Sequence, residues 1–228
     1  VTFAASGNNN RKQYLTLTTG TINCNGNITL NSDQNRHYVE VTGNGTMNVT
    51  GNFTGGAVNF SNGTLNLTGN AQTLAGGAGG STYNLFNLQC ANANTKTLGA
   101  NINVAGNLGI SGNARLDVSA SNRAVSVGGN WNVTSTNANP FNEREGTITF
   151  NGNVGTQTIS TVLAGGETFY RLLINNTSAS KPALLTTSNI NVSNDYDHTS
   201  GFLDLQGNSL TATNASAQTF ALTGGGLL

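Results

Sequence analysis

This chain of 228 residues has few charges: Asp, Glu, Lys and Arg make up 8% of it, and nine basic residues balance nine acidic ones. With no net charge and no cluster of Lys or Arg, the sequence lacks the basic surface that binds phosphate, which argues against nucleic acid as a partner. No apolar run approaches the roughly 20 residues of a transmembrane helix, so we predict no membrane span. No signal peptide is visible. Many amides and few charges are typical of secreted chains, so we expect an extracellular or cell-surface location and a signal peptide already removed.

Proline and helix-forming patterns are also scarce. The two prolines are Pro140 and Pro182, and no window of about 12 residues combines good helix formers with helical periodicity. Asn, Thr and Gly instead contribute 38, 32 and 30 residues. Short alternating runs such as TLNL and TITF are separated by ten Gly-Asn pairs, which we interpret as turns because Gly reaches positive φ at little cost. The chain is therefore predicted to be all-β with a thin core.

An internal repeat organises most of the sequence. From residue 51 the chain contains GNF, GTLNLTGN, QTL, TYNLFNL, NINVAGNL and RLDV, and from residue 129 it contains GNW, GTITFNGN, QTI, TFYRLLI, NINVSNDY and FLDL. Matched positions lie about 78 to 88 residues apart, and other matches lie about 64 residues apart. These offsets share a divisor near 21, close to one coil of a β-helix.

We therefore predict a single domain over 1–228, a right-handed parallel β-helix of about eleven coils of roughly 21 residues. Few positions point into so narrow a coil, so 36% hydrophobic residues suffice. Outward positions favour Thr and Asn, and stacked Asn side chains can hydrogen-bond from coil to coil in ladders. A β-sandwich is the alternative, but it predicts hairpin turns and no 21-residue spacing.

Three stretches carry a resemblance to a known family: LDVSASNRAVSVGGNW at 116–131, GTITFNGNVGTQTI at 146–159 and TFYRLLINN at 168–176. They resemble repeat units of large bacterial extracellular surface proteins, described as β-strand-repeat or adhesin-like proteins. The resemblance covers most of the chain and is clearest over 101–213. It implies parallel β-helix repeats and a cell-surface or filament role, and it supplies no catalytic residue.

No catalytic, cofactor or metal site is predicted. Some parallel β-helices cleave polysaccharides, which requires two carboxylates, or a carboxylate with Lys or Arg, in one cleft. Asp117 and Asp204 share a repeat position about four coils apart, and so about 20 Å from each other, and should point outward. Glu143 is expected in a solvated loop, and the polar run 195–198 is interpreted as a turn with too few oxygens for calcium. We therefore expect neither catalysis nor a cofactor.

The two cysteines are predicted to be separate buried thiols. Cys24 and Cys90 each occupy an alternation position that elsewhere carries an apolar residue. Their separation corresponds to about three coils, or roughly 14 Å along the axis. A disulfide requires Cα atoms within about 7 Å of each other, so we expect both thiols to be free.

Surface patterns indicate few ligands. Tyr14, Tyr38 and Tyr170 could be exposed but do not share a repeat position, so no aromatic row is predicted for sugars. T-x-T occurs at 16–18 and 147–149 and once more near the C-terminus without recurring coil after coil, which argues against ice binding. Acceptor sites for N-glycosylation, N-x-S/T, are plentiful. They are Asn27, Asn44, Asn48, Asn52, Asn59, Asn62, Asn66, Asn132, Asn175, Asn176, Asn191 and Asn214.

The two ends of the sequence indicate assembly. Neither carries the amphipathic helix or charged cap that a solenoid end usually needs. Val1 and Phe3 belong to a strand-like VTF, and Leu227 and Leu228 match the paired leucines of TFYRLLI. Either the chain is a fragment of a longer solenoid, or these four residues take part in head-to-tail stacking of the chain into a homopolymer.

The predicted function is structural: a subunit of an extracellular filament stacked end to end, or a segment of an adhesin stalk. The alternative is a carbohydrate-binding or carbohydrate-cleaving β-helix, with surface glycans as partners.

Overall fold

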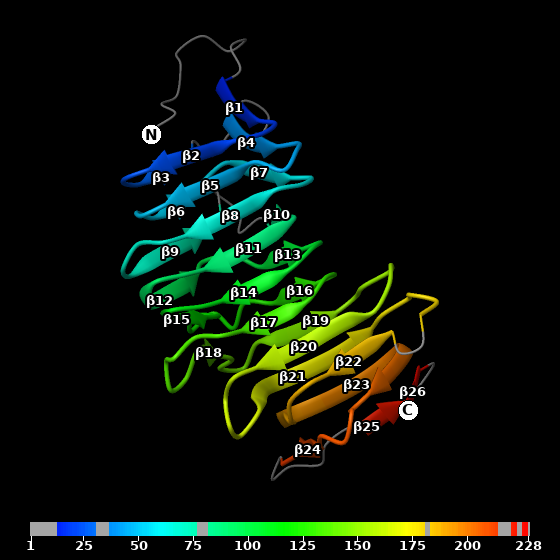
Figure 1. Cartoon of the computed structure of the whole chain (residues 1–228). Coiled ribbons are helices and arrows are strands. Elements are labelled where there is room, and N and C mark those ends of the chain that lie inside the picture. Colours follow the sequence, from blue (N-terminus) through cyan, green and yellow to red (C-terminus); the bar gives the residue numbers. More distant parts are fainter. Residues whose placement is uncertain are drawn as a thin grey trace.

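The chain winds into a parallel β-solenoid with three faces (Figure 1). The computed structural model describes residues 13–30, 37–76, 82–180, 183–213, 220–222 and 225–227, and within these ranges it contains strands and no helix. Each turn passes through face 1, then face 2, then face 3, and the strands of a face pair in parallel with those one turn earlier and later, except where face 3 ends at β18. The predicted parallel β-helix is confirmed, and the β-sandwich is wrong.

The strands of each face follow at intervals of one turn. Face 1 contains β1 (Gln13–Leu17), β4 (His37–Val41), β7 (Ala57–Phe60), β10 (Tyr83–Leu85), β13 (Ile102–Val104), β16 (Val125–Val127) and β19 (Thr147–Phe150). Face 2 contains β2 (Thr21–Cys24), β5 (Thr46–Val49), β8 (Thr64–Leu67), β11 (Asn87–Cys90), β14 (Leu108–Ile110), β17 (Trp131–Val133), β20 (Gln157–Thr161) and β22 (Leu184–Thr186). Face 3 contains β3 (Ile28–Thr29), β6 (Phe53–Thr54), β9 (Gln72–Ala75), β12 (Ala93–Leu98), β15 (Asn113–Asp117) and β18 (Phe141–Asn142).

Later strands run around the corners of the solenoid. β21 (Glu167–Asn175) begins at the position of face 3 and continues onto face 1, where it pairs with β19. β23 (Ile190–Asp204) passes through all three positions and pairs with β21, β22 and the short β24 (Leu210–Ala212), β25 (Phe220–Leu222) and β26 (Gly225–Leu227). The six-strand sheet of face 3 ends at β18. The next segment at that position, residues 167–169 of β21, pairs with β23 one turn later and not with β18 one turn earlier.

The number of coils differs from the prediction. Eight successive pairings carry face 2 from β2 to β23, so the solenoid has about eight turns rather than eleven. The matched motifs explain the error, because they fall on different faces: QTL lies in β9 on face 3, and QTI lies in β20 on face 2. The repeat therefore spans about three and two-thirds turns instead of four, which gives about 23 residues per turn.

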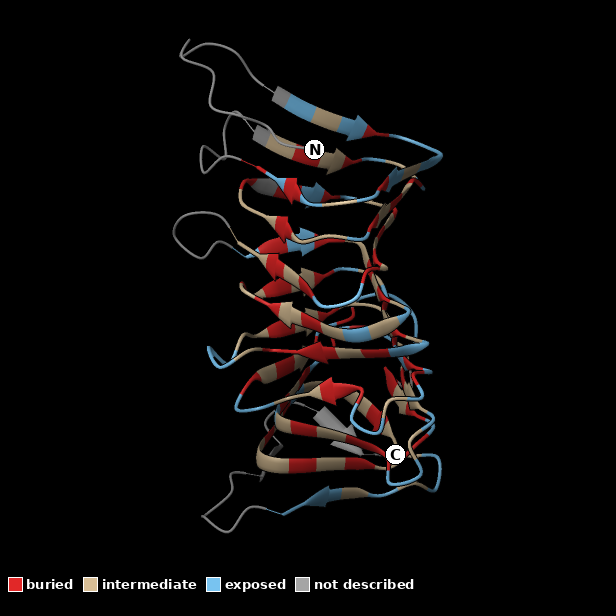
Figure 2. Ribbon diagram, turned by 90° about the vertical axis from the view of Figure 1, so that its left-hand side faces the viewer, coloured by how far each residue is buried: buried red, intermediate tan, exposed pale blue. Residues whose placement is uncertain are grey.

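The core is a set of stacked columns of inward side chains. Along the strands, buried residues alternate with more accessible ones (Figure 2). On face 2 one column runs from Met47 through Leu65, Leu88 and Leu108 to Trp131, and all five are essentially inaccessible to solvent. This alternation places every second residue of a strand inside, as the sequence pattern predicts.

Aromatic rings fill the core near the middle of the chain. The Trp131 ring packs edge-on against Phe141, Phe150 and Phe169, with centroid distances of 4.9, 6.2 and 5.5 Å. These rings come from all three face positions, so one aromatic cluster connects three sheets.

The repeated Gln-Thr motif contributes a buried hydrogen-bonded staple. Nε2 of Gln72 donates to the main-chain oxygens of Val49 and Gly51 at 2.9 and 2.6 Å, one turn earlier. Gln157 repeats this geometry with the main-chain oxygens of Val127 and Gly129, at 2.7 and 2.5 Å. Both glutamines are only 2% exposed, so the amides satisfy carbonyl groups that water does not reach.

The Gly-Asn pairs lie at corners, but some of their glycines are needed for a reason other than the predicted positive φ. Gly129 is not among the described residues of positive φ. A Cβ atom on Gly129 would instead lie 2.5 Å from the main-chain carbonyl carbon of Gly106 in the preceding turn. Glycine is required there because adjacent turns approach too closely for a side chain.

Candidate functional site

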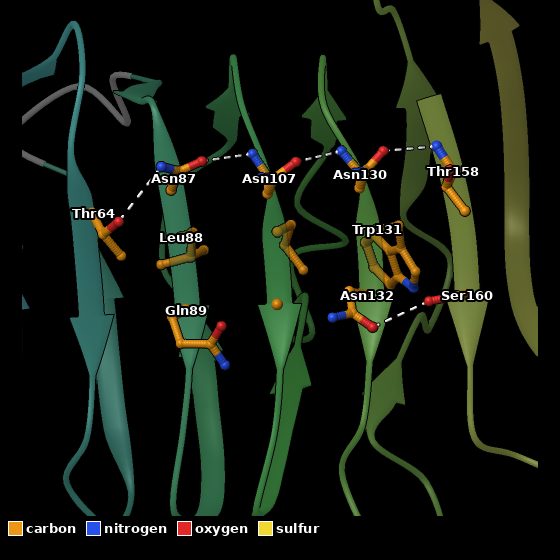
Figure 3. A pocket seen from close by; sticks show the side chains of 12 residues that line it. Thr64, Asn87, Leu88, Gln89, Asn107, Asn130, Trp131, Asn132, Thr158 and Ser160 are labelled. Carbon is orange, nitrogen blue, oxygen red and sulfur yellow. Dashed lines mark hydrogen bonds between the residues drawn. The ribbon is translucent and has the colours of Figure 1, made fainter. Parts of the chain in front are cut away.

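Face 2 carries a ladder of asparagine side chains along the corner that it shares with face 1 (Figure 3). Oδ1 of Asn87 accepts a hydrogen bond from the main-chain N–H of Asn107, Oδ1 of Asn107 from that of Asn130, and Oδ1 of Asn130 from that of Thr158, each at 2.8 Å. Each asparagine thus holds the following turn through its backbone. Asparagine ladders were predicted, and the structure confirms them, with main-chain donors in this column.

A second outward column lies beside the ladder. It runs through Asn66, Gln89, Gly109, Asn132 and Ser160 in register. Oδ1 of Asn132 accepts a hydrogen bond from the Ser160 hydroxyl at 3.1 Å, and Nε2 of Gln89 donates to the Ser111 hydroxyl at 2.8 Å. Gly109 interrupts the column because it has no side chain.

A groove of about 540 Å³ lies over this part of face 2 (Figure 3). It crosses five turns, from β8 to β20, and no residue that lines it is charged. Exposed amides and hydroxyls make its surface, because Leu88, Leu108 and Trp131 turn their side chains into the core. The lining residues are Thr64, Asn87, Leu88, Gln89, Asn107, Leu108, Gly109, Asn130, Trp131, Asn132, Thr158 and Ser160. The arrangement can bind an uncharged, hydrogen-bonding ligand and contains no group for acid–base chemistry.

A second cavity, of about 410 Å³, opens where the sheet of face 3 stops at β18. Glu143, which follows β18, and Glu167, the first residue of β21, both line it. Glu167 is 2% exposed, and its Oε2 accepts a hydrogen bond from Nε1 of Trp131 at 3.1 Å. Burial raises the pKa of Glu167 to about 7, although the bonds from Trp131 and the Thr168 amide favour the charged form.

Glu143 and Glu167 line the same cavity, and the charge of Glu143 acts on Glu167. The negative charge of Glu143 contributes to the raised pKa of Glu167. Burial also raises the pKa of Glu143, and the positive charge of Arg115 partly offsets that effect. This carboxyl pair was not predicted from the sequence, because Glu143 was expected in a solvated loop. A signal was present in the alternation, since Glu167 lies two residues before the inward Phe169 and so shares its face.

Asp117 and Asp204 both accept hydrogen bonds from neighbouring residues. Asp117, expected to point freely outward, is 7% exposed and binds Arg144 through two hydrogen bonds of 2.6 and 2.9 Å. Although desolvation acts in the opposite direction, these bonds hold the pKa of Asp117 below its usual value. Asp204 lies at the face 2 position and Asp117 on face 3, so the two do not share one column.

The run 195–198 is a strand and not the predicted turn. It lies within β23, with Tyr196 and His198 buried and the Tyr196 hydroxyl 3.1 Å from Nδ1 of His198. Asp195 forms an ion pair with Arg171 at 3.2 Å. Across the described part of the chain, no three His, Cys, Asp or Glu side chains gather as metal ligands would.

The cysteine prediction is confirmed. Cys24 and Cys90 are free and buried, and they lie three turns apart in one column of face 2. Burial raises the pKa of Cys90 to about 12, partly offset by the positive charge of Lys96. Lys96 is itself 1% exposed and donates to the main-chain oxygens of Gly69, Asn70 and Ala93, the last two at 2.9 Å.

Two tyrosines expected at unrelated positions are neighbours. Tyr14 and Tyr38 are paired in register on face 1, and their rings stack with centroids 5.3 Å apart. They are 24 residues apart, so a constant spacing of 21 residues wrongly predicts that they occupy different positions of the turn. Tyr14 is 55% exposed.

The predicted modification and assembly residues have different surroundings. Asn176 is fully buried, and its amide donates to Oε1 of Gln157 and to the main-chain oxygen of Ala183, both at 3.0 Å, so the folded chain does not present it for glycosylation. Asn214, Val1, Phe3 and Leu228 lie outside the described residues, and Leu227 pairs with Leu203 through its backbone. The other acceptor asparagines are at least partly exposed: Asn27, Asn44, Asn48, Asn52, Asn59, Asn62, Asn66, Asn132, Asn175 and Asn191.

The fold defines the chain as a β-solenoid protein. No helix in the described ranges is long and apolar enough to cross a membrane. No model of a known protein family matches the sequence, and no curated protein or solved structure matches it either.

Proposed function

We propose that this chain is a structural β-solenoid of an extracellular surface protein, acting as a stalk segment or as a subunit of an end-to-end filament. One observation carries the proposal: the pairing of face 2 runs without a break from β2 to β23, with asparagine and glutamine side chains bonding consecutive turns. Continuous main-chain bonding along an axis makes a stiff rod, because bending it would break bonds in several turns together.

The exterior supports the same role. With 8% charged residues and many Asn, Thr and Gly, the surface has little charge to attract nucleic acid or polyionic partners. Acceptor sites for glycosylation lie along its outside. We also propose that the chain has no catalytic activity.

Electron microscopy of undenatured protein tests it. Eight turns at about 4.8 Å give a rod about 40 Å long. Fibres with an axial repeat near that length would favour the filament, and separate rods would favour the stalk segment. A flexible or compact particle would contradict both. If the chain cleaves a polysaccharide and loses that activity on Glu167→Gln or Glu143→Gln, the non-catalytic assignment is overturned. Antibody labelling of intact source cells tests the surface location.

A further inference from the structure

We propose that the groove on face 2 is a binding site for a neutral oligosaccharide lying along the axis of the solenoid. The groove spans the turns from Thr64 to Thr158, which is four steps of about 4.8 Å, or about 19 Å. Its volume of about 540 Å³ falls in the range of ligand sites in proteins. A short linear chain of sugar rings fits an elongated groove of this size.

The groove offers unused hydrogen-bond donors. Asn107, Asn130 and Asn132 are exposed, and their described hydrogen bonds use only Oδ1 or the main chain. Within the described part of the chain, the Nδ2 donors of these three side chains are therefore available to a ligand. The Oδ1 bonds hold the asparagines of the ladder in place, so a ligand meets a surface that is already ordered, which lowers the entropic cost of binding.

The partner chemistry follows from these groups. Each amide supplies both donors and an acceptor, and each sugar hydroxyl is also a donor and an acceptor, so the two match in pairs. No charged side chain lines the groove, so an anionic sugar or a phosphate would lose hydration without gaining an opposite charge. A peptide added as a strand would need a free edge, whereas β11, β14 and β17 are paired on both sides.

Gly109 creates the depth of the groove. A Cβ atom there would lie 2.2 Å from Oε1 of Gln89, which is the far end of a flexible side chain. Gly109 is not among the described residues of positive φ. The substitution Gly109→Thr should therefore displace the Gln89 amide and fill the groove while leaving the backbone and core unchanged, and Thr suits a strand better than Gly.

The test is an NMR titration of backbone amides with the full chain. The probes are cellotetraose, maltotetraose and mannotetraose, with tetragalacturonate as the anionic control. We expect at least one neutral tetrasaccharide to bind with a Kd near or below about 1 mM and to shift amides over 87–89, 107–109 and 130–132. Gly109→Thr should weaken that binding at least about tenfold, which is about 1.4 kcal/mol. The matched control, Asn103→Thr, lies in the same turn on face 1 and should bind like the unmodified chain.

Several results would overturn the assignment. These are no shifts with any neutral probe, shifts outside the groove, equal binding of tetragalacturonate, or binding that survives Gly109→Thr. Shifts of the same amides on concentrating the protein without sugar would assign the groove to contact between copies instead. Thermal unfolding of both variants shows that they are folded. None of these outcomes depends on whether rods or fibres form.

Discussion

The buried carboxyl of Glu167 predicts an unusual dependence of stability on pH. Its folded-state pKa is about 7, against an ordinary value of 4.5, so the folded chain holds a proton that the unfolded chain releases between these values. Folding is therefore favoured most by this group below about pH 4.5, and that stability is lost as pH rises through 7. At 1.36 kcal/mol for each pKa unit, the loss is about 3 kcal/mol above pH 8, with most of it between pH 5 and pH 8.

The substitution Glu167→Gln should abolish this loss. Gln resembles the protonated acid in shape and still presents an oxygen to Nε1 of Trp131, but it does not ionise. We expect the variant to be more stable than the unmodified chain by about 3 kcal/mol at pH 8 and by less than about 1 kcal/mol at pH 5.

Urea unfolding followed by tryptophan fluorescence measures both quantities. Trp131 is the only tryptophan and is fully buried beside Glu167, so its emission reports unfolding at the site. At each pH, the free energy of unfolding of one protein is subtracted from that of the other. This is needed because burial lowers the pKa of His198, so His198 adds stability to both proteins as pH rises toward 6.5. The contribution of His198 to the free energy of unfolding cancels in this difference. The contribution of Glu143 cancels as well if the substitution leaves its pKa unchanged.

Glu145→Gln is the matched control, because it removes a carboxyl from an exposed side chain and leaves the buried site unchanged. Equal losses of stability from pH 5 to pH 8 in the unmodified chain and the Glu167→Gln variant would contradict the role assigned to Glu167. A variant less stable than the unmodified chain at pH 8 would refute it too.

Three further predictions concern buried polar groups. Lys96→Met should lower the free energy of unfolding by about 3 kcal/mol in urea titration, because three main-chain oxygens lose their donor; a loss below about 1 kcal/mol would mean that water replaces the ammonium group. Gln157→Leu should lower the free energy of unfolding by about 2 to 3 kcal/mol in the same measurement, because it removes the hydrogen-bonded staple between turns. Gln89→Leu on the surface is the control and should lower it little. A thiol reagent should label neither Cys24 nor Cys90 in the native chain and both after denaturation, and rapid labelling of the native chain would contradict their burial.

The positions that face inward can be predicted from the sequence alone. Alternation of apolar and polar residues needs no knowledge of distant parts of the chain, because the side chains of a strand alternate between its two sides. The parallel solenoid, the buried thiols of Cys24 and Cys90 and the asparagine ladder were all predictable on that basis. The alternation also contained the inward position of Glu167.

The pairing of residues between turns cannot be predicted from the sequence and is seen first in the folded chain. Hydrogen bonds join residues 18 apart at Asn48 and Asn66 but 28 apart at Asn130 and Thr158, because the corner loops differ in length. A single spacing of 21 residues therefore predicts too many coils and places Tyr14 and Tyr38 at different positions of the turn. It also concealed the meeting of Glu143 with Glu167, since that depends on the place where face 3 ends. Loop lengths set the register between turns, and the register sets which side chains share a groove or a cavity.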